Sequence, residues 1–267
     1  MQYIGALIGD YSGSKYEWSN FHGAITDKMD FIETGKFTDD SVLTIATMDW
    51  INNDIKYGKN HGFAPYLKMW AKRYPNAGYG GRFRIWVDSD SDEPINSFGN
   101  GAGMRVSPCA YYANTLEECL ELAKQSAEAT HNHPEGVKGA QAIAEAIYLA
   151  RSGAGKDGIK KVIEEDFGYE LDKELDEIGT KAHKFDATCQ VTVPEAIICF
   201  LKSSNFLDAI RNAIYIGGDT DTVAAMAASI AEAYYGIPHF IEETMKEKLP
   251  EDFKEVIYTF NENMLRR

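Results

Sequence analysis

The apolar residues of this chain recur with the period of an α-helix almost throughout, and almost no segment shows the alternation typical of a β-strand. Residues 115–130, for example, place Leu116, Cys119 and Ala123 on one helical face, and Thr115 begins a capping box at their start. The same period predicts helices over residues 41–53, 136–151, 192–202, 206–215, 221–235 and 251–264. We therefore expect an all-α fold with many helices packed around one core.

Residues 75–108 are the exception to this pattern, because they are rich in Gly, Asp, Ser, Asn and Pro. Irregular segments of such length within a compact domain are usually functional or disordered. The aromatic residues Tyr79, Phe83 and Trp86 argue against disorder. The segment is therefore predicted to be a long, ordered, functional loop.

The composition restricts the classes of partner. A chain of 267 residues with 44% hydrophobic content can bury one large core, and we expect a single domain over residues 1–267 and a monomer. A formal net charge of −14 disfavours nucleic-acid binding, because an acidic surface repels phosphate backbones. No apolar run approaches the roughly 20 residues of a membrane span, so no membrane partner is expected.

The four cysteines show no CxxC spacing, and the apolar N-terminal segment lacks the basic residues of a targeting signal. This pattern predicts reduced thiols in a cytoplasmic protein and argues against zinc bound through cysteine.

Two short acidic clusters stand out, at residues 38–41 (TDDS) and 217–222 (GGDTDT). Neighbouring carboxylates repel one another and lose hydration on burial, and a divalent cation offsets both effects. All candidate ligand atoms are oxygens, which favours Mg²⁺ or Mn²⁺ over zinc. The competing interpretation of each cluster is a helix N-cap with an acidic first turn. If the two clusters meet in space, they form a two-metal site.

Two further segments have both a functional and a structural interpretation. His131 and His133 could act as metal ligands, acid–base groups or ligand donors, or they could belong to a polar turn in which Pro134 begins the next helix. The glycine-rich residues 97–105 (SFGNGAGMR) could expose backbone N–H groups to an anion or form a surface loop. Taken alone, Glu17 is indistinguishable from any other solvated acidic residue.

Together these segments resemble the ADP-ribosylglycohydrolase family, which includes ADP-ribosyl-acceptor hydrolases and dinitrogenase-reductase-activating glycohydrolases. The resemblance is carried, in the family's order, by residues 5–10 (GALIGD), 13–17 (GSKYE), 37–41 (FTDDS), 99–105 (GNGAGMR), 130–131 (TH) and 217–222 (GGDTDT). It implies an all-α, roughly orthogonal multi-helix bundle with long functional loops. Ser41 departs from the threonine that is usual in the family but keeps the hydroxyl.

The resemblance also implies two Mg²⁺ or Mn²⁺ ions at the base of a cleft. The implied metal ligands are Thr38, Asp39, Asp40, Asp219, Asp221 and Thr222. The implied substrate-binding residues are Phe98, Gly99, Asn100, Gly101, Gly103, Met104 and His131. The implied catalytic residues are Glu17, which falls where an acidic residue reaches the reacting centre in some members, and Asp40 or Asp219 near the departing group.

The activity implied by the resemblance is metal-dependent removal of ADP-ribose from a modified protein side chain. The glycosidic bond at C1 of the distal ribose would break through an oxocarbenium-like state, with Glu17 as base or as stabiliser of positive charge. Two alternatives stay open: a metal-dependent phosphohydrolase that cuts the diphosphate of ADP-ribose-like compounds, and a non-catalytic ADP-ribose-binding protein. The stretch between Glu17 and Thr38 is short compared with some family members, which leaves the acceptor linkage open.

Overall fold

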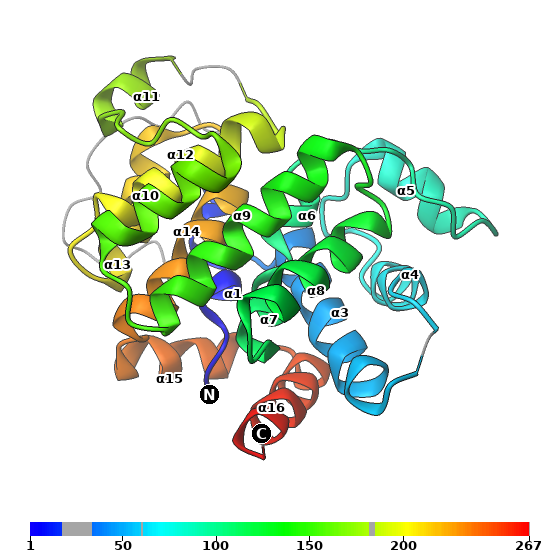
Figure 1. The fold of residues 1–267 in the computed structure, drawn as a ribbon. Coiled ribbons are helices and arrows are strands. Elements are labelled where there is room, and N and C mark those ends of the chain that lie inside the picture. The colour runs from blue at the N-terminus through cyan, green and yellow to red at the C-terminus, as the bar shows by residue number, and fades with distance from the viewer. Residues whose placement is uncertain (18–33, 60, 182–184, 267) are drawn as a thin grey trace.

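The computed structural model describes residues 1–17, 34–59, 61–181 and 185–266, and the regular elements within these ranges are helices. Within these ranges the only extended pairing is an isolated bridge between Gly99 and Thr188. The all-α prediction is confirmed, and the helices cross one another in many directions rather than forming a parallel bundle (Figure 1).

The elements run in chain order as follows. They are α1 (Gly5–Gly13), α3 (Asp39–Asn53), η1 (Ile55–Tyr57), α4 (Ala64–Arg73), α5 (Gly81–Asp88), α6 (Gly101–Met104), α7 (Ser107–Tyr112), α8 (Leu116–Glu128), α9 (Pro134–Arg151), α10 (Lys156–Phe167), α11 (Leu175–Lys181), α12 (Cys189–Leu201), α13 (Phe206–Ile216), α14 (Thr220–Tyr235), α15 (His239–Lys248) and α16 (Glu251–Leu265).

The centre of the core is the pair α1 and α14, drawn in blue and orange in Figure 1, with α9, α12 and α13 packed around α14. The two helices touch through the backbone at Gly5, Gly9 and Gly13 of α1. A Cβ built on each of these glycines would lie 2.6, 2.1 and 2.3 Å from carbonyl oxygens of α14. Only glycine allows such an approach.

The pairing of α1 and α14 is antiparallel, because Gly5 faces Ala228 whereas Gly13 faces Thr220. The C-terminal end of α1 therefore meets the N-terminal end of α14. This arrangement brings Asp10 and Asp221 together from opposite ends of the sequence.

The seven helices predicted from periodicity are all present, each within about three residues of its predicted bounds. At the start of α8, Thr115 Oγ1 accepts a hydrogen bond from Glu118 N at 3.1 Å, and Glu118 Oε2 accepts one from Asn114 N at 2.6 Å. The capping box is confirmed for Thr115, with the reciprocal bond one residue earlier than in the standard motif.

The prediction of one continuous loop over residues 75–108 was wrong. The segment contains α5, α6 and the start of α7. Phe83, Trp86 and Val87 are buried at helical spacing, but the flanking glycines and aspartates concealed so short a period. The glycine-rich turn is in part the single helical turn of α6.

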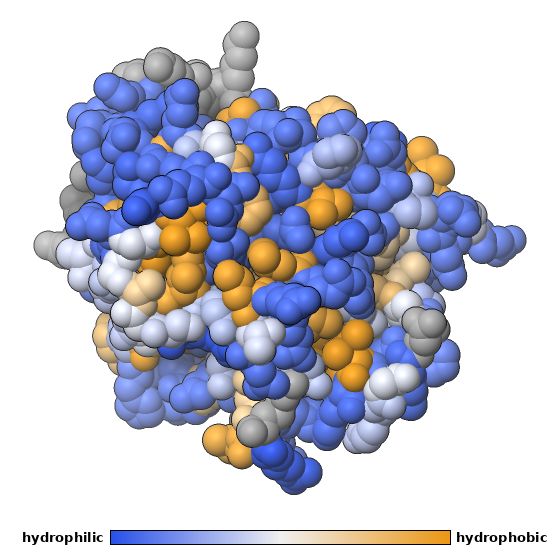
Figure 2. Space-filling model, viewed as in Figure 1, coloured by the Kyte–Doolittle hydropathy of each residue, from blue (hydrophilic) through white to orange (hydrophobic). Residues whose placement is uncertain are grey.

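The surface agrees with the composition. Hydrophilic residues cover most of the face in Figure 2, and hydrophobic residues form separate patches between them. The four cysteines are buried and unpaired. Among the described helices, none has both the length and the apolar character needed to cross a membrane.

Candidate active site

Asp10 organises the start of α3, and the sequence analysis did not select it as a site residue. Its Oδ2 accepts hydrogen bonds from the backbone N–H of Thr38 at 2.9 Å and of Ser41 at 3.1 Å, and its Oδ1 accepts one from Thr38 Oγ1 at 2.7 Å. The Ser41 hydroxyl also donates to Asp10. A lone carboxylate in an otherwise apolar, fully buried helix was the signal that could have revealed this role.

The start of α3 partly fits the N-cap interpretation. Thr38 is the N-cap, and its Oγ1 accepts a hydrogen bond from Asp40 N at 3.4 Å. Asp39 and Asp40 occupy the first turn, where Asp40 is 2% exposed and Asp39 is half-buried. Thus the cap explains Thr38 but does not explain why the Asp40 carboxylate is buried.

The start of α14 departs further from a simple cap. Gly217 and Gly218 have φ values of 76° and 79°, which other residues rarely adopt. Asp219 follows as the N-cap but makes no side-chain cap hydrogen bond. Its Oδ2 instead accepts a hydrogen bond from Asn100 Nδ2 at 2.7 Å. The Asp219 carboxylate is therefore directed away from the helix amides.

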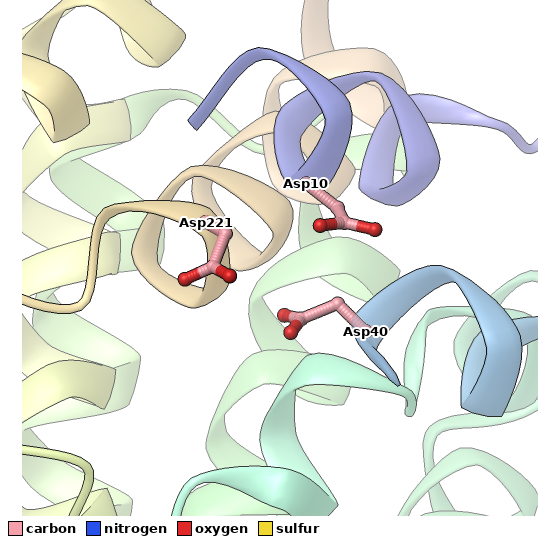
Figure 3. Close-up of side chains that lie close together, drawn as sticks. All are labelled: Asp10, Asp40 and Asp221. Carbon is pink, nitrogen blue, oxygen red and sulfur yellow. The ribbon is translucent and has the colours of Figure 1, made fainter. Parts of the chain in front are cut away.

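The two acidic clusters meet, as the metal-site hypothesis requires. Carboxylate oxygens of Asp10, Asp40 and Asp221 all lie within 4.8 Å of one another, and Figure 3 shows these side chains converging from α1, α3 and α14. A second group, formed by Glu17, Asp219 and Asp221, satisfies the same limit. Asp221 belongs to both groups, so the two candidate cation positions are adjacent.

The buried carboxylates repel one another, so a positive charge between them would stabilise the site. Burial, reinforced by the charge of Asp221, raises the pKa of Asp10 to about 7 and holds the pKa values of Asp40 and Asp219 well above the ordinary range. Asp40 Oδ1 is buried and has no hydrogen-bond partner, whereas its Oδ2 accepts one from Thr222 Oγ1 at 3.2 Å. A buried, unpaired carboxylate oxygen among oxygen donors fits a hard divalent cation.

The predicted metal ligands are not all placed alike. Asp40, Asp219 and Asp221 belong to the two groups of converging carboxylates, whereas Asp39 belongs to neither. The Asp39 carboxylate lies beside Gly78, 3.1 Å from where a Cβ would stand. The Thr38 and Thr222 hydroxyls both donate to carboxylates of the first group.

A cavity of about 430 Å³ opens next to the carboxylates. Of the predicted substrate-binding residues, those that line it are Gly99, Asn100, Gly101, Met104 and His131. Phe98 and Gly103 are absent from its wall. The Phe98 ring packs against His133 at 5.3 Å between centroids, and a Cβ on Gly103 would lie 3.0 Å from Met226 Sδ.

The two histidines of the HNH segment have different surroundings. His133 is the N-cap of α9, with Pro134 in the first turn, and its Nδ1 accepts a hydrogen bond from Glu135 N at 3.1 Å. His131 is 6% exposed and lines the cavity. The structural interpretation therefore holds for His133, and His131 is left as the candidate site residue.

We expect the metal-free protein to lose stability as the pH rises from 6 to 8.5. The pKa of Asp10 is raised to about 7 and that of Asp39 to about 8, mainly by burial and next by Asp221. A carboxyl group whose pKa is raised in the folded state stabilises the fold at pH values below its unfolded pKa of about 4. This stabilisation is lost as the pH rises through the folded-state pKa.

Thermal unfolding in EDTA and in Mg²⁺ at both pH values tests this expectation. Burial also raises the pKa values of Glu145, Glu195 and Glu232 to about 7, so the diagnostic quantity is the rise in Tm that Mg²⁺ produces. That rise should be larger at pH 8.5. An equal rise at both pH values would contradict the assignment of the raised pKa values to the metal site.

Comparisons with known proteins agree over nearly the whole chain. The sequence model of the ADP-ribosylglycohydrolase family matches residues 3–267. The chain is 27% identical to ADP-ribosylhydrolase ARH3 of Mus musculus, over 97% of this chain and 86% of that protein. It is 24% identical to ADP-ribosylarginine hydrolase Tri1 of Pseudomonas putida (strain GB-1), over 90% of this chain and 72% of that protein. A solved structure described as an ADP-ribosylglycohydrolase-related protein complex superposes with a TM-score of 0.69 at 20% identity, covering 97% of this chain and 95% of that chain, which supports the fold.

Proposed function

Because this chain belongs to the ADP-ribosylglycohydrolase family and is an ADP-ribosyl hydrolase, we propose that it cleaves the glycosidic bond at C1 of a protein-linked ribose with two divalent cations. The observation that carries this proposal is the pair of acidic groups that share Asp221 at the edge of the cavity. A carboxylate common to both groups could help to hold two neighbouring cations, as two-metal hydrolysis requires.

The proposed cation sites are built from the two groups of carboxylates. Asp10, Asp40 and Asp221 surround one position, and Glu17 and Asp219 join Asp221 around the other. The remaining predicted ligands, Thr38, Asp39 and Thr222, adjoin these groups and stay proposed ligands. When bound, Mg²⁺ or Mn²⁺ would neutralise the carboxylates, orient the ribose hydroxyls and acidify water.

The cavity wall supports binding of the ADP-ribosyl group. Gly99 and Gly101 expose backbone where no side chain intervenes, which suits a diphosphate. A Cβ on Gly101 would lie 3.0 Å from His131 Nε2, so the glycine keeps the backbone close to that ring. Asn100 lies between them and holds Asp219, so the glycine turn and the proposed metal site are directly connected.

Glu17 is the proposed proton acceptor. It lies just beyond α1, is half-buried, lines the cavity and has a carboxylate oxygen within 4.8 Å of those of Asp219 and Asp221. From this position it can accept the proton of the attacking water while positive charge develops at C1. Asp40 or Asp219 would contact the departing group.

Glu17→Gln should lower turnover by about 10²–10⁴-fold, the usual contribution of a general base, while the Kd for ADP-ribose changes little. The measurement is steady-state release of ADP-ribose at saturating Mg²⁺ together with calorimetric binding of ADP-ribose. A large loss of affinity with unchanged turnover would assign Glu17 to binding alone. Titration with Mg²⁺ separates a loss of the base from a loss of metal.

The proposed function is tested by incubating the protein with arginine-, serine- and nucleobase-linked ADP-ribose, in Mg²⁺ and in EDTA. Free ADP-ribose that forms only with metal supports glycosidic cleavage. AMP plus ribose phosphate would identify a phosphohydrolase, and binding without turnover on any substrate would identify a non-catalytic binding protein.

The partner is then an ADP-ribosylated protein, and we further propose a monomeric, cytoplasmic enzyme. The four buried, unpaired cysteines support a reducing compartment.

A further inference from the structure

Behind the candidate ligand-binding residue His131, the inner wall of the cavity contains buried polar side chains to which the proposed reaction assigns no role. Arg105 and Thr130 are fully buried, and His131 is 6% exposed. Arg105 follows α6 and Thr130 lies just beyond α8, so residues distant in sequence meet behind the glycine turn. Arg105 and His131 both line the cavity.

The direction of each hydrogen bond among Arg105, Thr130 and His131 follows from which groups can donate and which can accept. Arg105 Nη2 contacts Ser126 O at 2.8 Å and Thr130 Oγ1 at 3.0 Å. A guanidinium only donates, so Thr130 Oγ1 must accept. The Thr130 hydroxyl proton then needs its own acceptor.

That acceptor is His131 Nδ1, which lies 2.7 Å from Thr130 Oγ1. Within the described residues, no other acceptor is recorded for this buried hydroxyl. If Nδ1 carried a proton instead, the Thr130 hydroxyl would face two donors and its own proton would have no partner. The arrangement that satisfies both the Thr130 hydroxyl and Nδ1 leaves Nδ1 unprotonated and places the ring proton on Nε2, although Nε and Nη1 of Arg105 have no recorded partner in the described part of the chain.

The other ring nitrogen faces the glycine turn. Nε2 of His131 lies 3.0 and 3.8 Å from the positions that a Cβ would take on Gly101 and Gly99, and both glycines line the cavity. Burial, with added repulsion from Arg105 and Arg82, holds the pKa of His131 well below its usual range. The ring therefore presents a fixed N–H donor on the cavity side and stays neutral.

We propose that Arg105 and Thr130 are positioning residues that lock His131 as the neutral Nε2–H tautomer, so that His131 donates a hydrogen bond to an oxygen of the ADP-ribosyl ligand and does not exchange protons. The identity of the ligand rests on the proposed function, whereas the tautomer does not. Loss of the Thr130 hydroxyl should free the ring to take either tautomer and weaken this one contact.

The test compares the wild-type protein with Thr130→Val, which keeps the shape but not the hydroxyl, and with Thr130→Ser, which keeps the hydroxyl. In ¹⁵N-histidine NMR without ligand, His131 of the wild-type protein and of Thr130→Ser should have an unprotonated Nδ1 and a protonated Nε2. Thr130→Val should show a mixture of tautomers. Its Kd for ADP-ribose should rise about 3–10-fold, the effect of one hydrogen bond, with kcat nearly unchanged.

A protonated Nδ1 in the wild-type protein, or a Thr130→Val variant that keeps both the wild-type tautomer and the wild-type Kd, would overturn the inference. The wild-type spectrum alone decides the tautomer if Thr130→Val does not fold. The NMR result is independent of turnover. If the wild-type protein shows the expected tautomer but releases no ADP-ribose, the proposed function is contradicted and the assigned His131 tautomer is not.

Discussion

Replacing Asp221 with asparagine should lower ADP-ribose release by more than about 100-fold, because losing even a partner that only supports a metal ligand costs about 10–100-fold. Within the described residues, Asp221 is the one residue present in both groups of converging carboxylates. Asparagine keeps the size of the side chain but removes the negative charge that both proposed cations share. Steady-state release assays and calorimetric Mg²⁺ titrations measure the two losses.

Asp157→Asn is the matched control, because Asp157 also occupies the first turn of a helix but is exposed to solvent. This variant should keep its activity and its Mg²⁺ affinity. Full activity of Asp221→Asn, above all in the presence of EDTA, would contradict the two-metal proposal.

The sequence predicted the helices well because burial of one helical face leaves a local signal. The acidic residues alone left open whether residues 38–41 and 217–222 meet, and the resemblance to the ADP-ribosylglycohydrolase family implied that they share a metal site. The first prediction depends on residues that are close together in the chain, and the second depends on motifs that occur in the family's order. The structure agrees with each of them.

The role of Asp10 could not be predicted in the same way. A single carboxylate in an apolar segment indicates a special role but does not identify its partners, because Thr38 and Ser41 are brought to Asp10 by tertiary packing. The sequence also could not show which of the neighbouring residues Asp39 and Asp40 faces the other carboxylates. Residues 39 and 40 differ by about 100° around a helix axis, so only one of them can face α1 and α14. That one is Asp40.

The clearest effect on stability is expected from Gly9→Ala, which should lower the free energy of unfolding by about 3 kcal/mol or more, at or above the usual range for overpacking. The new Cβ would lie 2.1 Å from Ala224 O and 2.5 Å from Ala224 C. These are backbone atoms of α14, so no side-chain rotation relieves the contact. Urea unfolding followed by circular dichroism measures the change.

Gly158→Ala is the control, since Gly158 is an exposed position in α10 with nothing within 4 Å of its Cβ position. This variant should keep the wild-type stability or gain up to about 1 kcal/mol, because alanine has a higher helix propensity than glycine and Gly158 lies in the first turn of α10. Gly9→Ala should also lose activity at temperatures where it is still folded, because separating α1 from α14 moves Asp10 away from Asp221. A folded Gly9→Ala variant with wild-type turnover would show that the site does not depend on the close approach of these two helices.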